Sequence, residues 1–174
     1  MDAVTTVPAR PAAAPRSFEE VVQAELDAVY RYLVFLVGDR TLAEDLTGET
    51  FEHALRAWRR FDPRRAGPRT WLCRIARNVA LDWLRSERRR RRREETYARL
   101  NETEVVFSDG DPETLELALL ELSAAEREVI ALRVLLDLDG PSAARVLGIS
   151  TTACSTRLSR ALSRLEERMR DVRD

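Results

Sequence analysis

The stretch "WLCRIARNVALDWLRSERRRRRR" occupies residues 71–93 and joins an amphipathic helix pattern to an unbroken run of six arginines. Its apolar residues recur at the three- and four-residue spacing of an α-helix, and they are Leu72, Ile75, Ala76, Val79 and Trp83. At about 100° per residue, the opposite face carries Arg74, Arg77, Asn78, Arg85, Arg88 and Arg92. The stretch therefore predicts a helix with one side on a core and the other strongly basic.

Two further helix patterns precede this stretch. Ser17 with Glu20, and Thr41 with Glu44, follow the spacing of a capping box, which marks the start of a helix. They predict helices over residues 17–37, before Gly38, and from residue 41 to about residue 58. The prolines and glycine of "FDPRRAGPR" then interrupt the pattern, and Thr70 is expected to cap the third helix. Together these helices predict one compact domain over residues 17–93.

A second helical unit is predicted over residues 113–174. Ser123 and Glu126 form a capping box for a helix that reaches about residue 136. "GPSAARVLGIS" and a helix over residues 151 to about 169 then follow the pattern of a helix-turn-helix. Gly148 would supply its left-handed turn residue, Ile149 would fill the angle between the helices, and Ser150 would cap the second helix. The expected fold class is all-α, with two small helical domains.

The segments outside these units have a different composition. Residues 1–16 are rich in proline and alanine, which predicts a disordered leader. Residues 94–112 carry six acids and one arginine, which predicts a flexible acidic linker. Within it, the apolar residues 105–107 fit either a short strand or a hydrophobic anchor in an extended tether, and we favour the anchor.

The net charge of −1 conceals a strong segregation of charge along the chain. Residues 17–55 carry nine acids and two arginines, a net of −7, whereas residues 56–93 carry fifteen arginines and three acids, a net of +12. All 29 basic residues are arginine, so every basic contact can be bidentate. Such blocks indicate separate partners for separate faces, and the basic block favours a polyanion.

Several function classes are disfavoured by the composition. Cys73 and Cys154 fall in different predicted helices, which suits buried thiols in a reducing cytoplasm better than a disulfide framework or redox sensors. His53 is the single histidine, so most metal sites and His-dependent triads are excluded. The N-terminus has no apolar run that would suggest a signal peptide or membrane span. No nucleophile with a base and no glycine-rich phosphate loop is found, so we expect no enzyme and no cofactor.

Both nucleic-acid signals have an ordinary structural alternative. The helix-turn-helix pattern also fits an αα-hairpin with a solvated arginine face, although residues 142–165 hold four arginines and no acid, which favours DNA. Aromatic residues interleaved with arginines can stack on unpaired bases. For Trp71 and Trp83 a place in the core is the better interpretation, and for Phe61 both remain open. The acidic face of Asp45, Glu49 and Glu52 is either solvated or a site for an arginine-bearing protein.

The two segments together resemble a known family. "AEDLTGETFEHALRAWRRFDPRRAGPRTWLCRIARNVALDWLR", followed by "LSAAEREVIALRVLLDLDGPSAARVLGISTTACSTRLSRALSRL", is similar to bacterial RNA polymerase sigma factors. The short length resembles the extracytoplasmic-function (ECF) class, which keeps only the second and fourth conserved regions. The resemblance covers residues 17–93 and 113–169, and it implies that the protein directs RNA polymerase to a two-part promoter and assists strand opening.

The resemblance implies three contact sets. Core polymerase would contact the protein at its clamp helices and flap, and the clamp-helix segment would include Asp45, Leu46, Glu49, Thr50 and Phe51. The downstream promoter element, partly melted, would be read by Phe61, Arg64, Arg65, Arg69, Thr70, Trp71, Arg74, Arg77, Asn78, Asp82, Arg85 and Arg88. The upstream element would be read as duplex by Thr151, Thr152, Ala153, Ser155, Thr156, Arg157, Ser159, Arg160 and Arg164. The family also implies an anti-sigma protein as a partner and a linker in the RNA exit path.

The chain departs from the family pattern at five positions. Gly48 stands where glutamine is common, and Pro68 replaces a commonly aromatic residue. Ser142 replaces the usual glutamate, and Ala153 and Ser155 replace the usual threonine and lysine. The base specificity of the second unit is therefore the family property that can least be carried over to this chain.

Two other functions fit parts of the pattern. A dimeric helix-turn-helix regulator would bind duplex DNA alone at two-fold half-sites. An RNA-binding protein would depend on the arginines of residues 88–93 and ignore the second unit. The sigma factor hypothesis accounts for both units and is the one we favour.

Overall fold

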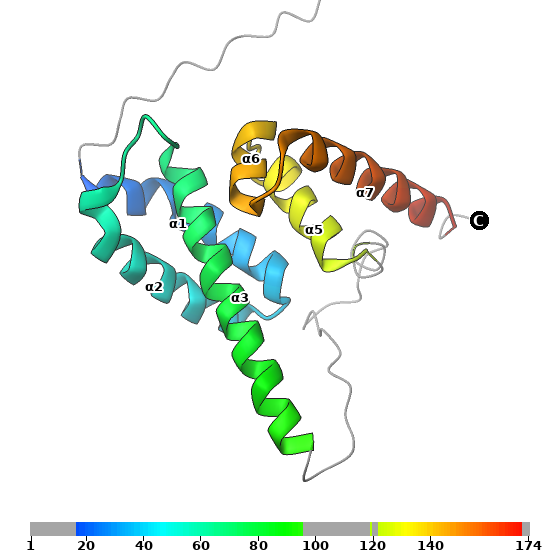
Figure 1. Ribbon diagram of the computed structural model, residues 1–174, viewed down its shortest axis with the longest axis horizontal. Coiled ribbons are helices and arrows are strands. Elements are labelled where there is room, and N and C mark those ends of the chain that lie inside the picture. Colours follow the sequence, from blue (N-terminus) through cyan, green and yellow to red (C-terminus); the bar gives the residue numbers. More distant parts are fainter. Residues whose placement is uncertain (1–16, 96–118, 120–121, 172–174) are drawn as a thin grey trace, which may run out of the picture.

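The computed structural model describes residues 17–95, 119 and 122–171, which form helices and the turns between them (Figure 1). The first unit comprises α1 (Phe18–Val37), α2 (Arg40–Ala57), the short 3-10 turn η1 (Trp58–Arg60) and α3 (Pro68–Glu95). The second comprises α5 (Ala124–Ile130), the π-helical turn η2 (Ala131–Leu135), α6 (Gly140–Leu147) and α7 (Thr151–Asp171). The all-α fold with two helical units is confirmed. The predicted leader, residues 96–112 of the linker and the anchor at residues 105–107 lie outside the described residues.

The ends of α1 follow the sequence prediction. The Ser17 hydroxyl accepts a hydrogen bond from the Glu20 backbone N–H at 3.2 Å. At the other end Gly38 adopts a left-handed conformation, with φ 71°, and donates to the Val34 carbonyl at 2.8 Å. A side chain would be strained at that φ, so glycine ends the helix here.

The predicted N-terminal caps of α2 and α3 were wrong. Asp39, not Thr41, caps α2, and its carboxylate accepts from the Leu42 N–H at 2.9 Å. Helix α3 begins at Pro68, where the missing N–H leaves no bond unmade. Thr70 therefore lies inside the first turn of α3, where it is buried rather than acting as a cap.

The second unit is capped as predicted. Ser123 and Glu126 exchange both bonds of the capping box, at 3.3 and 3.0 Å. Helix α5 then widens into η2, which ends where the Leu136 N–H donates to the Ala131 carbonyl. Gly148 has φ 68°, and the Ser150 hydroxyl accepts from the Ala153 N–H at 3.1 Å. These caps fix the angle of the helix-turn-helix.

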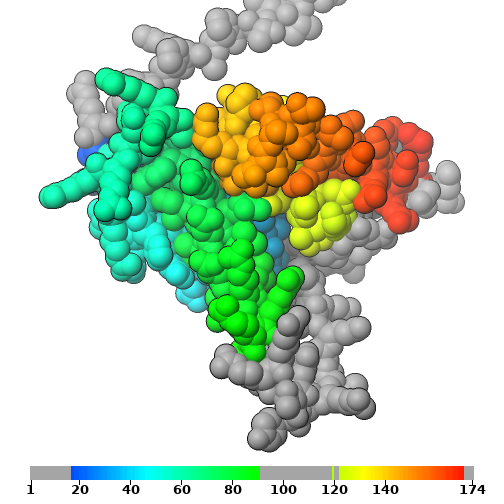
Figure 2. Space-filling model, in the orientation of Figure 1, coloured from blue at the N-terminus to red at the C-terminus, as the bar shows by residue number. Residues whose placement is uncertain are grey.

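One continuous cluster of buried residues runs through both units. Tyr32 and Leu72 from the first unit and Leu132 from the second are each completely buried. Helix α1 packs against α5 and η2, and α3 packs against α6. Figure 2 shows the second unit pressed against the first along α3. None of the described helices combines the length and apolar character needed to cross a membrane.

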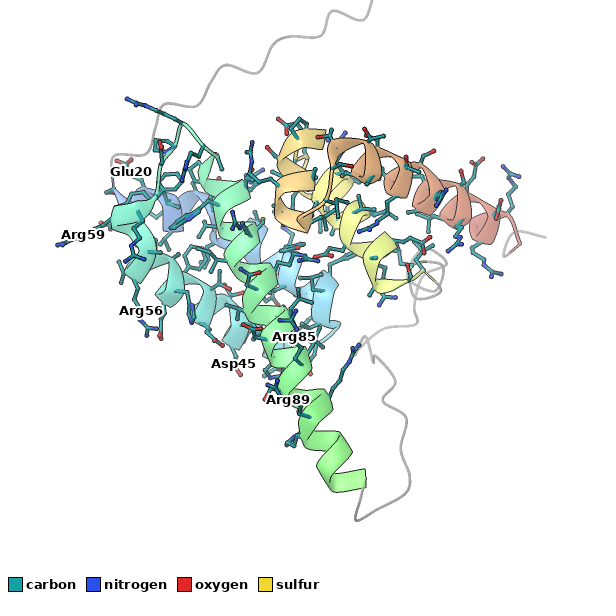
Figure 3. All side chains as sticks on the ribbon, viewed as in Figure 1. Glu20, Asp45, Arg56, Arg59, Arg85 and Arg89 are labelled. Carbon is teal, nitrogen blue, oxygen red and sulfur yellow. The ribbon has the colours of Figure 1, made fainter. Side chains whose placement is uncertain are left out.

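Helix α3 is long enough to pack within the bundle over one half and to project beyond it over the other. Its 28 residues correspond to a length of about 42 Å. The N-terminal half packs within the molecule, whereas the C-terminal half, where Figure 3 labels Arg85 and Arg89, projects beyond the bundle (Figures 1 and 3). Helix α3 thus continues beyond the bundle through the part of the chain that carries the arginine run.

Candidate nucleic-acid and protein interfaces

The loop before α3 has a fixed shape. The Asp62 carboxylate accepts from the Arg64 N–H at 3.0 Å, and the Asp62 carbonyl accepts from the Arg65 N–H at 3.0 Å. This is an Asx turn, in which a short acidic side chain substitutes for a backbone acceptor. The arginine side chains are both exposed. The loop therefore presents two guanidinium groups on an ordered backbone.

An aromatic cluster lies beside this loop. Phe61 stacks on Trp58 with ring centroids 5.1 Å apart and an interplanar angle of 14°, and its centroid lies 4.8 Å from that of Trp71. Phe18 completes the cluster, 5.5 Å from Trp58. Because one face of the Phe61 ring is covered by Trp58, at most one face can meet a base. Trp71 packs against the core, as does Trp83, in agreement with the interpretation from the sequence.

Some residues on the basic face of α3 are exposed, and others are half-buried in ion pairs with acids elsewhere in the protein. Arg74, Asn78 and Arg88 are exposed, and Arg85 pairs with Asp82 at 2.9 Å. Arg69 and Arg77 are half-buried instead. Arg69 binds the Glu25 carboxylate at 2.7 Å, and Arg77 binds Glu128 of the second unit at 2.6 Å, a contact that the sequence did not indicate. The exposed residues form a basic strip that continues into the projecting half of the helix.

The helix-turn-helix places α7 with its first turns outward. Most of the residues assigned to the upstream element are exposed, and they are Thr151, Thr152, Ala153, Ser155, Thr156, Ser159, Arg160 and Arg164; Arg157 is half-buried. Cys154 and Ala161 face the core from the other side. The helix therefore offers a continuous polar face with three arginines, which suits the major groove.

A groove of about 600 Å³ lies between the start of α5 and this face of α7. It is lined by Ser123, Ala125, Glu126, Ser150, Thr152, Ala153, Thr156, Arg157, Arg160 and Arg164. Arg164 binds Glu126 at 2.7 Å across the groove. The Ser123 hydroxyl, which donates to the same carboxylate, is the main cause that lowers the pKa of Glu126; the charge of Arg164 lowers it further, and burial opposes both. The ionised carboxylate therefore holds this guanidinium in place.

Of the residues that the resemblance assigned to the clamp-helix contact on α2, only some are exposed. Asp45 and Glu49 are exposed, whereas Leu46 and Thr50 are buried. The Thr50 hydroxyl donates to the Leu46 carbonyl at 2.7 Å, so both residues support the helix from inside. Phe51 is half-buried and packs against the core. Figure 3 shows Asp45 near one end of α2 and Arg56 near the other.

In the described part of the chain, no group of three or more histidine, cysteine, aspartate and glutamate side chains is arranged to hold a metal ion. Cys73 and Cys154 are both buried.

Glu126 and Glu128 each bind an arginine, and the sequence analysis assigned neither of them to a functional surface. Acids inside a helix usually face water, so no sequence signal indicated these contacts. The capping box indicated only a structural role for Glu126.

Known proteins share both units. Residues 21–90 match the family model described as Sigma-70 region 2, and residues 113–165 match that described as Sigma-70, region 4. ECF RNA polymerase sigma factor BldN of Streptomyces coelicolor is 37% identical over 150 residues, which covers 80% of this chain and 56% of BldN. ECF RNA polymerase sigma factor SigC of Mycobacterium tuberculosis is 33% identical over 152 residues, which covers 84% of this chain and 80% of SigC.

Solved structures show the same arrangement of helices. The sigma factor RpoE of Bartonella quintana, in complex with the anti-sigma factor NepR, has a TM-score of 0.73 and 25% identity, and the match covers 88% of this chain and 96% of that one. CnrH, in complex with the cytosolic domain of CnrY, has a TM-score of 0.62 and 28% identity, and the match covers 86% and 85%. The chain therefore belongs to the ECF class of RNA polymerase sigma factors, which direct RNA polymerase to promoters.

Proposed function

We propose that the three faces of this sigma factor have separate tasks during promoter recognition. The exposed acids Asp45 and Glu49 of α2 bind the clamp helices of core RNA polymerase. The ordered loop and the basic strip of α3 hold the downstream promoter element, and α7 reads the upstream element. The observation that supports this division most is the exposure of one acidic and two basic faces on three different helices.

The downstream contacts are proposed to combine strand binding with phosphate binding. Arg64 and Arg65 are exposed on the loop that follows Phe61, whose ring is a candidate for stacking on an unpaired base. Arg74, Arg85 and Arg88 lie along α3 and would bind the phosphates of the same region. Leu46, Thr50 and Thr70 are buried, so they are assigned to the support of these surfaces.

The upstream contacts are proposed to rest on the N-terminal turns of α7. Thr151, Thr152 and Ser155 are exposed there and can reach base edges, while Arg157 and Arg160 lie further along and can bind phosphates. Two elements read by two connected units bind more tightly than either alone, because each contact raises the effective concentration of the other.

Further partners follow from the family. The second unit is proposed to contact the polymerase flap, and an anti-sigma protein is proposed to cover one or both units. The protein would act in the cytoplasm, where the polymerase is, and would itself make or break no bond.

Run-off transcription with core RNA polymerase and fragmented genomic DNA tests the proposal. The wild type should give specific start sites, and Asp45→Arg/Glu49→Arg should abolish them. Glu19→Arg/Asp27→Arg on α1 is the matched control, since it changes the same charge at exposed positions and should retain them. Specific duplex binding without polymerase, and no transcription, would support a dimeric regulator instead.

A further inference from the structure

The Glu126 carboxylate of α5 is held at both of its oxygens. Oε2 accepts hydrogen bonds from the Ser123 hydroxyl at 2.8 Å and from the Ser123 backbone N–H at 3.0 Å. Oε1 accepts from Nη1 of Arg164 on α7 at 2.7 Å. One oxygen is therefore fixed by the helix cap, and the other is directed at an arginine of the second helix of the helix-turn-helix.

The two members of this ion pair differ in their exposure to water. The Glu126 side chain is 10% exposed, whereas the Arg164 side chain is 63% exposed. In the pair between Glu166 and Arg170, also on α7, the two side chains are 68% and 69% exposed. Two exposed side chains gain little from pairing, because both must be ordered to meet. Arg164 instead meets a partner that the fold has already placed.

Arg164 keeps donors for another ligand. The contact with Glu126 uses Nη1, and a guanidinium carries five N–H groups in a planar fork. Arg164 lines the groove between α5 and α7 together with Arg157 and Arg160, which precede it at spacings of three and four residues on the same face of the helix. Three guanidinium groups and one carboxylate give this groove a net positive charge, which suits a phosphate of a DNA backbone.

We propose that Glu126 is a positioning residue for DNA binding, which holds the Arg164 guanidinium in the orientation that binds a backbone phosphate of the upstream promoter element. This inference rests on the proposed function of α7. An unattached arginine loses rotamer freedom when it binds a phosphate, whereas Arg164 has already lost much of that freedom to Glu126. The acid thus strengthens DNA binding although its charge has the same sign as that of DNA.

This role reverses the usual effect of removing an acid. A carboxylate near DNA repels the phosphates, so its neutralisation ordinarily strengthens binding. Neutralisation of Glu126 should weaken binding, because the released Arg164 must be ordered at each binding event. Glu128 of the same helix binds Tyr32 and Arg77 of the first unit, so a change at Glu126 leaves the contact between the units in place.

A double-mutant cycle tests the proposal. The complex of the full chain with core RNA polymerase is titrated with a promoter fragment recovered by run-off transcription. Glu126→Gln, Arg164→Gln and the double variant form the cycle. Glu167→Gln, at an exposed position on α7, is the control for the loss of one acid.

Glu126→Gln should weaken binding about fivefold, whereas the control should not weaken it. Arg164→Gln should weaken binding about tenfold and reduce the slope of log affinity against log salt by about 0.9, as expected for one lost phosphate contact. When Arg164 is already replaced, Glu126→Gln should cause no further loss.

Two results overturn the proposal. Affinity of Glu126→Gln equal to or above that of the control would mean that the acid acts through its charge alone. An equal loss with and without Arg164 would mean that Glu126 only supports the fold. Thermal melting checks the variants, and if Glu126→Gln is unfolded at the assay temperature, Ser123→Ala, which frees the carboxylate to move, replaces it in the cycle.

Failure of the proposed function would be seen separately. If the wild type transcribes no fragment, that function fails, and the same cycle is then measured with the free chain and a mixed-sequence DNA duplex. Phosphate contacts do not depend on base sequence, so the same two results decide the role of Glu126 there.

Discussion

Glu126 and Glu128 lie two positions apart on α5 and bind arginines on opposite sides of this short helix. Glu126 holds Arg164 of α7 at 2.7 Å, and Glu128 holds Arg77 of α3 at 2.6 Å. The first contact organises the second unit internally, and the second connects that unit to the first. Helix α5 is thus the element that connects α7 to α3.

Glu126→Gln should lower the free energy of unfolding by about 1–2 kcal/mol near neutral pH, because the capping box and the ion pair both lose a charge. The pKa of Glu126 is lowered in the folded protein, so its stabilising effect is complete above the usual value of 4.5 and is lost as the pH falls through the lower, folded pKa. Urea unfolding at several pH values should show the two proteins converging at acid pH. Glu166→Gln, in an exposed pair with Arg170, should cost less than about 0.5 kcal/mol; an equal loss would contradict the prediction.

Gly48→Ala should stabilise the protein by about 0.5–1 kcal/mol. Gly48 lies within α2, it is exposed, and an added Cβ would meet no atom within 4 Å. Alanine restricts the unfolded chain and favours the helix, so the change acts mainly through backbone entropy. Urea unfolding measures the gain, and an unchanged or lowered stability would show that the helix needs flexibility here.

Gly148→Ala is the same substitution with the opposite expected sign. Gly148 has φ 68°, and although nothing crowds its Cβ position, an L side chain is strained at that angle. We expect a loss of about 1–2 kcal/mol in unfolding free energy and weaker transcription from two-part promoters. Wild-type stability would mean that the turn can relax without glycine.

Cys73 and Cys154 should react slowly with Ellman's reagent in the native protein. Burial raises the pKa of the Cys73 thiol to about 12, with a smaller contribution from the charge of Glu25, and burial also raises the pKa of Cys154. At pH 8 the reactive thiolate of Cys73 is then about one molecule in ten thousand. Both thiols should react fast in urea. A native thiol that reacts as fast as the unfolded one would indicate an exposed, redox-competent cysteine.

Arg85→Gln/Arg88→Gln should weaken DNA binding in a salt-dependent way. Both arginines are exposed on α3, and each phosphate contact that is lost should reduce the slope of log affinity against log salt by about 0.7–0.9. Titrations of the sigma–polymerase complex with promoter DNA at several salt concentrations measure this slope. A uniform loss of affinity with an unchanged slope would place these arginines away from phosphates.

Local sequence signals predicted most of the helices. The cap residues Ser17, Ser123 and Ser150, and the glycine stops Gly38 and Gly148, act within a few residues of themselves and were found correctly. Helix α3 begins earlier than expected, at Pro68, whose fixed φ and missing N–H suit the first helical position. The start of α2 was misplaced because Asp39 and Thr41, which both have capping ability, stand close together, and the structure alone shows which one is used. Propensity cannot separate such neighbours, since both satisfy the same backbone groups.

The interface between the units had no such signal. Glu128 stands in a helix where an acid ordinarily faces water, and Tyr32 has the spacing of a core residue. Arg77 belongs to a basic face that the sequence assigned wholly to nucleic acid, although its guanidinium is paired with that glutamate. Periodicity shows which side of a helix is apolar, but it does not show which distant segment covers its polar edge.

The core that runs through both units also determines how the molecule loses its structure. Packing between α1 and α5 and between α3 and α6 couples the two parts, so heating the free protein should give one melting transition whose calorimetric and van't Hoff enthalpies agree. If the two units are separated, each retains only the packing among its own helices. We therefore expect a chain with separated units to be cleaved by proteases faster than the closed chain.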